Sequence, residues 1–183
     1  MVAIKYIQKS FSVSGLLIGL MLIVGLSPLS AQQASALKGH DTGQALDVTA
    51  NEIRLKQKKG QAFMTGSVEV SQGELMLTAN QIVVFYDINA GFDNPSVQRL
   101  DATGGVKLTS PSETISSEWA VYDVVKRIVT LGGKVAYNGI DAAISGDRLE
   151  LNLSTGLVKL DGQLTDGEQR VTGRFSVPKK EKQ

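Results

Sequence analysis

The residue types that most often carry out chemistry in proteins are sparse in this sequence. It has no cysteine and a single histidine, His40. A His-based triad, a thiolate nucleophile and a histidine-rich metal site therefore lack material. The Asp and Glu residues are scattered over positions that we expect to face outward, so we interpret His40 and the carboxylates as solvated groups. The sequence predicts no catalytic residue, no metal and no cofactor, and a hydrolase of envelope polymers is only the third interpretation.

Short basic and glycine-rich segments are the next candidates. Residues 104–107 and 132–134 superficially resemble phosphate loops, but both lie inside repeated strand patterns with no helix after them, so a phosphate cradle is missing. Lys56, Lys58 and Lys59 could contact lipid phosphates at the mouth of a groove, although a solvated turn is the simpler interpretation. The chain has 19 Lys and Arg against 18 Asp and Glu, and no concentrated basic face. Nucleic acid is therefore not an expected partner.

The remaining candidate for a functional surface is the set of apolar residues, and these recur in a regular repeat. In residues 62–70, apolar and polar residues alternate with the two-residue period of a half-buried strand. Just before, the apolar parity shifts between Ala50 and Ile53, which requires a bend. Three further copies follow with a period of about 29 residues, the second lengthened by an insertion of about nine residues within 88–96. The copies align on Thr49-Ala50-Asn51, Thr78-Ala79-Asn80, Ser116-Ser117-Glu118 and Ser145-Gly146-Asp147, and on Gly66, Gly104, Gly133 and Gly162.

This repeat predicts the fold class. Four tandem units of two bent strands give an elongated, all-β body of about sixteen antiparallel strand segments, stacked as V-shaped layers with apolar residues inside. We expect a last strand over 171–177, Trp119 on the outer surface, and no helix after residue 36. The domain then spans 46–177, and residues 178–183 form a solvated charged tail.

The N-terminal residues do not belong to the repeat. Lys5 and Lys9 precede an apolar run over 16–26, followed by small-residue endings at Ala31 and Ala36. This layout predicts a secretory signal peptide within 1–36, cleaved after Ala31 or Ala36, because the run is short for a membrane span of roughly 17 to 25 residues. An uncleaved anchor stays open as an alternative. Residues 32–45 are expected to form a flexible leader.

Two consecutive motifs resemble a known family. Residues 63–73 (FMTGSVEVSQG) are followed by Leu75, Leu77, Thr78-Ala79-Asn80-Gln81-Ile82 and Val84. This combination resembles the LptA/OstA family of periplasmic lipopolysaccharide-transport proteins, over roughly residues 46–177. The chain has Asn51 and Asn80 where the family more often has Asp, a change that concerns only the bend. The resemblance implies a half-open β-jelly roll that receives lipopolysaccharide through LptC, shields its acyl chains and passes it to LptD at the outer membrane.

The resemblance and the periodicity together define a candidate site. We predict that the inward apolar columns contact lipid A acyl chains, because small residues on or beside the same rows leave width between the arms. A packed core is the alternative for these columns. The predicted groove residues are Leu46, Val48, Ile53, Leu55, Met64, Val68, Leu77, Ile82, Val84, Val106, Ile115, Tyr122, Val124, Leu131, Val135, Ile144, Leu149 and Leu151.

The two ends of the stack are a second candidate site. The segments 46–55 and 171–177 are expected to present unpaired backbone groups, which invite another strand. LptC-like and LptD-like domains are the expected partners, and head-to-tail self-association is a further expectation. The leader or the tail could instead cover one edge. The sequence therefore predicts a periplasmic carrier, with an LptC-like anchored component or a secreted β-solenoid scaffold with a closed core as alternatives.

Overall fold

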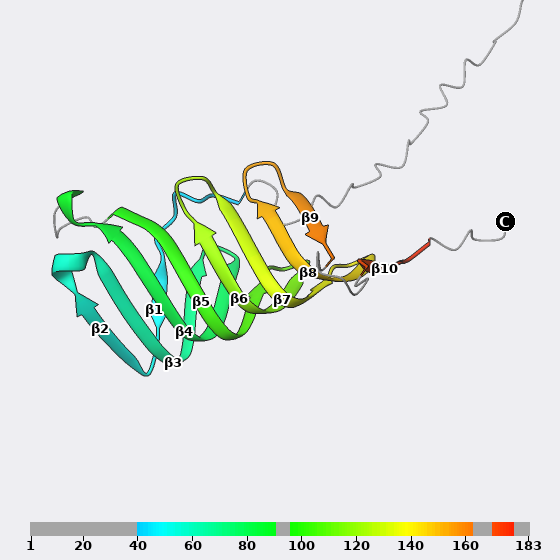
Figure 1. Cartoon of the computed structure of the whole chain (residues 1–183). Helices are drawn as coiled ribbons and strands as arrows, with labels where there is room; N and C mark the ends of the chain where they lie inside the picture. The colour runs from blue at the N-terminus through cyan, green and yellow to red at the C-terminus, as the bar shows by residue number, and fades with distance from the viewer. Residues whose placement is uncertain (1–39, 91–95, 163–169, 178–183) are drawn as a thin grey trace, which may run out of the picture. The chain divides into compact units, whose positions relative to one another are not determined.

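The computed structural model describes residues 40–90, 96–162 and 170–177. The predicted signal peptide, most of the leader, part of the insertion and the charged tail lie outside these ranges. The described residues form one antiparallel sheet of ten strands (Figure 1). Its strands are β1 (Asp47–Thr49), β2 (Glu52–Lys56), β3 (Gln61–Gln72), β4 (Leu75–Asp87), β5 (Ser96–Thr109), β6 (Thr114–Asp123), β7 (Ile128–Asn138), β8 (Ala142–Asn152), β9 (Leu157–Asp161) and β10 (Thr172–Phe175).

Helical structure is limited to two short turns within the described ranges. They are the 3-10 turns η1 (Gln57–Lys59) and η2 (Ile88–Ala90). In the part of the chain that the structure covers, no helix has the length and apolar character needed to cross a membrane. The prediction of an all-β domain is therefore confirmed for the described residues.

The sheet follows the order of the chain. Its path runs β1-β3-β4-β5-β6-β7-β8-β10, with β2 also paired to β3 and β9 also paired to β8. The strands β3 to β8 are long, with 10 to 14 residues each, and consecutive ones pair antiparallel. The expected number of about sixteen segments counted the two arms of every bent strand separately. Ten strands form instead, because each long strand keeps its hydrogen-bonded ladder on both sides of its bend.

The bend is a bulge built on the repeated glycine. At Gly66-Ser67, Gly104-Gly105 and Gly133-Lys134, two successive residues have positive φ, between 46° and 80°. The registers of β3, β5 and β7 with their neighbours shift at these same places. A pair of left-handed residues adds length to one strand only, so that strand must turn.

The repeated polar residue lies directly over this glycine. A Cβ on Gly66 would come within 2.9 Å of the Asn51 Cβ, and one on Gly133 within 2.8 Å of the Glu118 Cβ. The backbone N–H of Asn51 also donates a hydrogen bond to the backbone carbonyl of Gly66, at 3.0 Å. The two sequence anchors of the first three units therefore meet across neighbouring strands, which explains why the glycines and the polar residues recur together.

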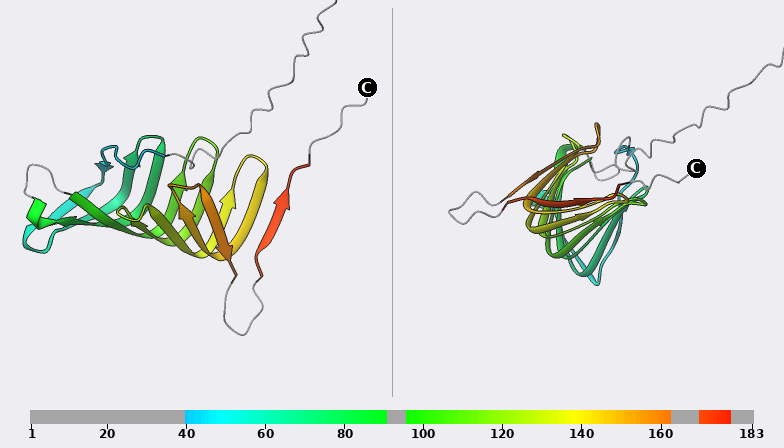
Figure 2. Two further views of the ribbon diagram at one scale, coloured as in Figure 1. Left: turned by 90° about the horizontal axis from the view of Figure 1, so that it is seen from above. Right: turned by 90° about the vertical axis from the view of Figure 1, so that its right-hand side faces the viewer.

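The bends divide the sheet into two arms that form a V (Figure 2, right). One arm contains β2 and β9 and is called the β2–β9 arm; the other contains β1 and β10 and is called the β1–β10 arm. Residues that are paired from strand to strand form a column across each arm. The side chains of one column lie on the same face of the sheet. The inner column of the β2–β9 arm is Leu55, Ala62, Val84, Leu100, Tyr122, Val129, Leu151 and Val158, and that of the β1–β10 arm is Val48, Val70, Leu77, Leu108, Ile115, Tyr137 and Ile144.

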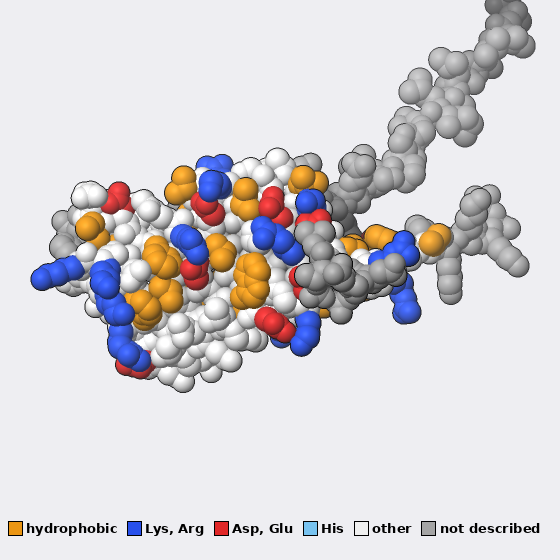
Figure 3. All heavy atoms as spheres, viewed as in Figure 1, with side chains coloured by type: hydrophobic (Ala, Val, Ile, Leu, Met, Phe, Trp, Pro, Cys, Tyr) orange, Lys and Arg blue, Asp and Glu red, His pale blue; other side chains and the backbone are white. Residues whose placement is uncertain are grey.

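The outer face shows the complementary pattern. Trp119 projects there, opposite Ala120 and Tyr122, and stacks over Gly132 of the neighbouring strand. Its predicted outward position is confirmed. The face seen in Figure 3 mixes hydrophobic side chains with charges of both signs. The parity shift read between Ala50 and Ile53 is confirmed as well, since Val48 pairs with buried Val70 and Ile53 with buried Met64.

Candidate functional site

An apolar cavity lies between the two arms at the end of the sheet that begins with β1 and β2. Its volume is about 320 Å³. Leu46, Val48 and Val70 come from the β1–β10 arm or the segment leading into it, and most of the other lining residues come from β2, β3, β4 and β5. The remaining lining residues are Leu55, Gln57, Ala62, Met64, Val84, Tyr86, Asp87, Ile88, Val97 and Leu100.

The cavity opens at the edge strand β2. Leu55 and Ile53 pair with Ala62 and Met64, so they face the inside of the V, yet they are 61% and 49% exposed. They are exposed because β2 pairs only with β3 among the described strands, and no further layer covers it. At this end, the inner face that the sequence predicts to line a groove is open to solvent.

A buried polar cluster at Gln72 lies beside a small hollow that shares Leu46, Val70 and Leu100 with the cavity. The Gln72 side chain accepts a hydrogen bond from the Tyr122 hydroxyl at 3.1 Å, although Gln72 and Tyr122 belong to opposite arms. Its amide nitrogen donates to the carbonyls of Thr42 and Gln44, at 3.0 and 2.9 Å. His40 Nε2 lies 3.2 Å from the Gln72 side-chain oxygen. Gln72 therefore ties the two arms and the leader together.

This cluster corrects two expectations about the leader. His40 is half-buried against Gln72 rather than freely solvated, and residues 42–44 are held by hydrogen bonds rather than flexible. The physical reason is that a buried amide must satisfy both its donor and its acceptor, and the leader backbone supplies the acceptors. Burial also raises the pKa of Tyr122 above its ordinary value, an effect that the positive charge of Arg127 partly opposes.

Beyond Gln72 the interior is filled by the protein's own side chains. A hollow of only about 20 Å³ adjoins the cluster, between Leu46, Leu77, Leu108 and Val129. Further along, Leu131, Leu149 and Leu151 are fully buried, and so is Leu153 from the turn after β8. Small residues do not leave width here: a Cβ on Gly146 would already meet the Leu160 side chain. The V is thus hollow at one end and packed at the other.

The predicted groove residues divide according to this arrangement. Leu46, Val48, Leu55, Met64 and Val84 line the cavity, while Leu77 and Tyr122 line the small hollow. Ile53 is exposed on the edge strand, and Val124 and Ile144 are half-buried. The remaining eight are 1% exposed or less, either beside the bends or in the packed end; they are Val68, Ile82, Val106, Ile115, Leu131, Val135, Leu149 and Leu151.

Several cavity residues were not among the predicted ones. Ala62, Val70 and Leu100 share the inner columns, so periodicity alone could have included them. Gln57 and Ile88 come from the turns η1 and η2, where no period exists. No sequence signal identifies residues of that second kind.

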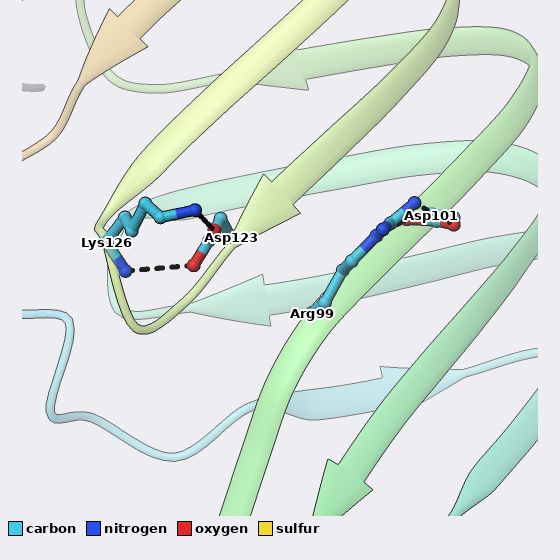
Figure 4. A network of polar contacts seen from close by, with 4 residues as sticks. All are labelled: Arg99, Asp101, Asp123 and Lys126. Carbon is cyan, nitrogen blue, oxygen red and sulfur yellow. Dashed lines mark hydrogen bonds and ion pairs between the residues drawn. The ribbon is translucent and has the colours of Figure 1, made fainter.

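Five ion pairs join exposed or partly exposed charged side chains among the described residues. Arg99 forms a two-point ion pair with Asp101, and Lys126 contacts Asp123 at 2.9 Å (Figure 4). The hydrogen bond from Lys126 lowers the pKa of Asp123 below its ordinary value. Such exposed pairs each contribute about 0 to 1 kcal/mol, so they mainly keep the outer face soluble. Within the described ranges, no cluster of three or more His, Asp or Glu residues could hold a metal ion.

The chemistry of the cavity is that of a binding site for apolar chains. Its wall is mostly aliphatic; the exceptions are the aromatic Tyr86 and the polar Gln57 and Asp87, and Asp87 accepts hydrogen bonds from Asn89. No nucleophile is paired with a base there. A ligand would be held by burial of its apolar surface and oriented by the polar groups at the opening.

Comparison with known proteins agrees with this architecture. The model of the family described as "LptA/(LptD N-terminal domain) LPS transport protein" matches residues 47–157. An uncharacterized protein of Rhizobium meliloti (strain 1021) is 24% identical over 164 residues, which is 87% of each chain.

A solved structure shares the fold. The crystal structure of LptH, described as the LptA homologous periplasmic component of the lipopolysaccharide transport device of Pseudomonas aeruginosa, has a TM-score of 0.65. The match has 19% sequence identity and covers 75% of this chain and 99% of LptH. The open β-jelly roll and the family match together show that the chain belongs to the LptA/LptD N-terminal domain family of lipopolysaccharide transport proteins.

Proposed function

We propose that this protein is a periplasmic carrier that binds the acyl chains of lipopolysaccharide between its two arms and forms part of a bridge from the inner to the outer membrane. The observation that carries the proposal is the aliphatic cavity of about 320 Å³, which opens at the edge strand β2. Family membership supports the transport role, and the predicted signal peptide supports export. The carrier performs no chemistry, and the direction of transport comes from its partners.

The size of the cavity supports partial shielding of the lipid. Ligand sites are commonly about 300 to 1,000 Å³, so this one suits a portion of the acyl chains rather than a whole lipid A. Burial is worth about 0.8 kcal/mol per methylene, and ten methylenes would bring about 8 kcal/mol before the cost of association. The chains that do not fit need shielding from a neighbouring domain.

The edges of the sheet support assembly with such a domain. Among the described strands, β1 and β2 pair only with β3, and β9 and β10 pair only with β8. Each end therefore has backbone donors and acceptors that another strand can use. An LptC-like or LptD-like jelly roll added to β2 would extend the V and lengthen the cavity across the junction. Head-to-tail self-association would use the same edges.

Site-specific photo-crosslinking in the envelope tests the carrier proposal. A benzophenone side chain at Val48, in the cavity, should yield lipopolysaccharide adducts. The same side chain at Val121, on the outer face of the same sheet, is the matched control and should yield none. Adducts at neither position, or equally at both, would argue against acyl binding between the arms.

One observation favours the closed-core alternative for part of the molecule. The interior from β6 to β8 is packed, as expected of a scaffold. Mass spectrometry of the protein isolated from its envelope separates the proposals: a bound lipid supports the carrier, and its absence supports the scaffold. The same spectrum reads the mature N-terminus, which distinguishes a cleaved carrier from an LptC-like anchored component.

A further inference from the structure

A basic depression adjoins the apolar cavity at its open end. It has a volume of about 410 Å³ and is lined by Leu55, Lys56, Gln57, Lys58 and Lys59, from the end of β2 and the turn η1. Leu55 and Gln57 line the apolar cavity as well. The two hollows therefore adjoin at Leu55 and Gln57, one lined mainly by aliphatic side chains and the other by lysines.

The positive charge of this depression is not neutralised by ion pairs, unlike that of five other cations among the described residues. Arg54, Arg99, Lys126, Lys134 and Lys159 each contact a carboxylate.

No such partner lies within 4 Å of Lys58 or Lys59 among the described residues, and both side chains are exposed on a three-residue turn. Lys56 is engaged differently, with its ammonium 4.0 Å from the Phe63 ring centre. Lys58 and Lys59 thus carry uncompensated positive charge at the mouth of an aliphatic cavity.

The turn is fixed in place rather than loosely attached. Gly60, which ends η1 with φ of 59°, accepts a hydrogen bond from the Tyr86 amide at 2.9 Å. Tyr86 and the adjoining Ile88 line the cavity. The lysines are therefore positioned by the same residues that form the apolar wall. Asp87 is the nearby carboxylate on that wall, and its Oδ1 already accepts hydrogen bonds from Asn89.

We propose that Lys58 and Lys59 bind the phosphate group of an anionic amphiphile whose acyl chain lies in the adjoining cavity. This orients the ligand, with its head group at the β2–η1 edge and its chain directed toward Gln72 and Tyr122. The inference rests on the proposed function, because it assigns the head-group end of the same site. Charge complementarity selects the phosphate, and the shared residues Leu55 and Gln57 connect it to the chain.

A pair of matched single-chain lipids tests the inference. Lysophosphatidic acid and the monoacylglycerol of the same chain length differ only in the phosphate, and both can displace a neutral fluorescent acyl probe from the purified protein. We expect the phosphate-bearing lipid to bind more tightly by about threefold to tenfold at low salt, since exposed charge pairs each contribute a modest factor. The preference should shrink as salt is added.

The variant Lys58→Gln/Lys59→Gln should abolish this preference and leave monoacylglycerol binding unchanged. The control Lys107→Gln/Lys159→Gln removes the same charge from strands away from the depression and should keep the preference. A preference that survives in the first variant, or that falls equally in the control, overturns the inference. Failure of both lipids to displace the probe would instead reject the proposed acyl site itself.

Two further arms separate other sources of the same chemistry. Inorganic phosphate at millimolar concentration and constant ionic strength should not reduce the preference, because the turn alone gives little affinity. Loss of the preference in that arm would show a free-phosphate site and overturn the coupling to the chain. Binding to anionic phospholipid vesicles that depends on Lys58 and Lys59, without any preference between the two monomeric lipids, would assign the turn to a membrane surface and also overturn it.

Discussion

The two ends of the V-shaped sheet, at β1–β2 and at β6–β8, share the same backbone architecture. The interior is hollow at the first end and packed at the second. At the β1–β2 end, the inner columns enclose a cavity that opens at Leu55; at the β6–β8 end, Leu131, Leu149 and Leu151 exclude solvent completely. Both ends use the same bend, with a left-handed glycine beneath a polar residue. The backbone therefore does not decide whether the trough is open. The side chains and turns that reach into it do.

The boundary between the two regions is equally informative. The hydrogen bond between Gln72 and Tyr122 joins the arms, and the leader residues Thr42 and Gln44 complete it. In the packed region, Leu153 lies in the turn after β8, where its backbone amide donates a hydrogen bond to the Arg127 carbonyl. The open region has no comparable plug among the described residues. The difference supports the proposal that a ligand binds at one end, while the packing of the other end stabilises the fold.

The largest expected effect comes from truncating the packed end. Leu149→Ala should lower the free energy of unfolding by about 2 to 5 kcal/mol, because it leaves a void among fully buried neighbours. Leu55→Ala, on the exposed inner face of β2, should change it by less than about 0.5 kcal/mol. Urea denaturation measures both. Similar losses in the two variants would mean that the ends are not different in packing.

The bends should be equally costly to disrupt in both regions. Gly66→Ala and Gly133→Ala should each lose about 2 to 3 kcal/mol, since an alanine there has an unfavourable left-handed backbone and meets Asn51 or Glu118. Gly105→Ala is the control: its φ is 60°, but its Cβ would meet nothing within 4 Å, so about 1 kcal/mol is expected. Unequal losses at Gly66 and Gly133, measured by denaturation, would show that the backbone contributes to the difference between the ends.

Adding volume should separate binding from stability. Ala62→Leu projects into the cavity and should weaken displacement of an acyl probe severalfold with little change in the free energy of unfolding. Ala120→Leu, at an inward position that is 2% exposed and lines neither the cavity nor the small hollow, should cost about 1 to 3 kcal/mol through overpacking. Probe titration and urea melts on both variants make the comparison. Full probe affinity in Ala62→Leu would contradict the assignment of the cavity as the binding site.

A modest, pH-dependent effect is expected at the boundary between the hollow and the packed region. Tyr122→Phe removes the hydrogen bond between the arms and should cost about 1 kcal/mol at neutral pH. Because burial raises the pKa of Tyr122 in the folded protein, its contribution is complete below the unfolded pKa of about 10 and declines as the pH rises toward the higher folded pKa.

The variant should therefore lose less stability than the wild type between neutral pH and pH 11. Denaturation at several pH values measures this difference. Parallel pH profiles for the two proteins would show that Tyr122 does not titrate as a buried group.

Much of the fold follows from residues close together in the sequence. Only the structure placed the recurring Gly66, Gly104 and Gly133 at the bend, whereas alternation had specified the strands and the parity shift after Ala50 had specified that they bend. These are local properties, because the face of a side chain depends only on its place along the strand and a left-handed residue favours glycine wherever it occurs. Trp119 was placed outward for the same reason. The family resemblance added the open jelly roll, which periodicity could not distinguish from a closed core.

The division of the interior was decided only by tertiary structure. The hydrogen bond at its boundary joins residues 50 positions apart, and Ile88 and Gln57 reach the cavity from turns without a period. Whether an inward Leu or Val lines a cavity or fills a core depends on what faces it across the V. That facing residue comes from the other arm of the V or from a distant part of the chain, so no local pattern records it. Sequence determined which side chains point inward, and the three-dimensional packing of both arms determined where space remains between them.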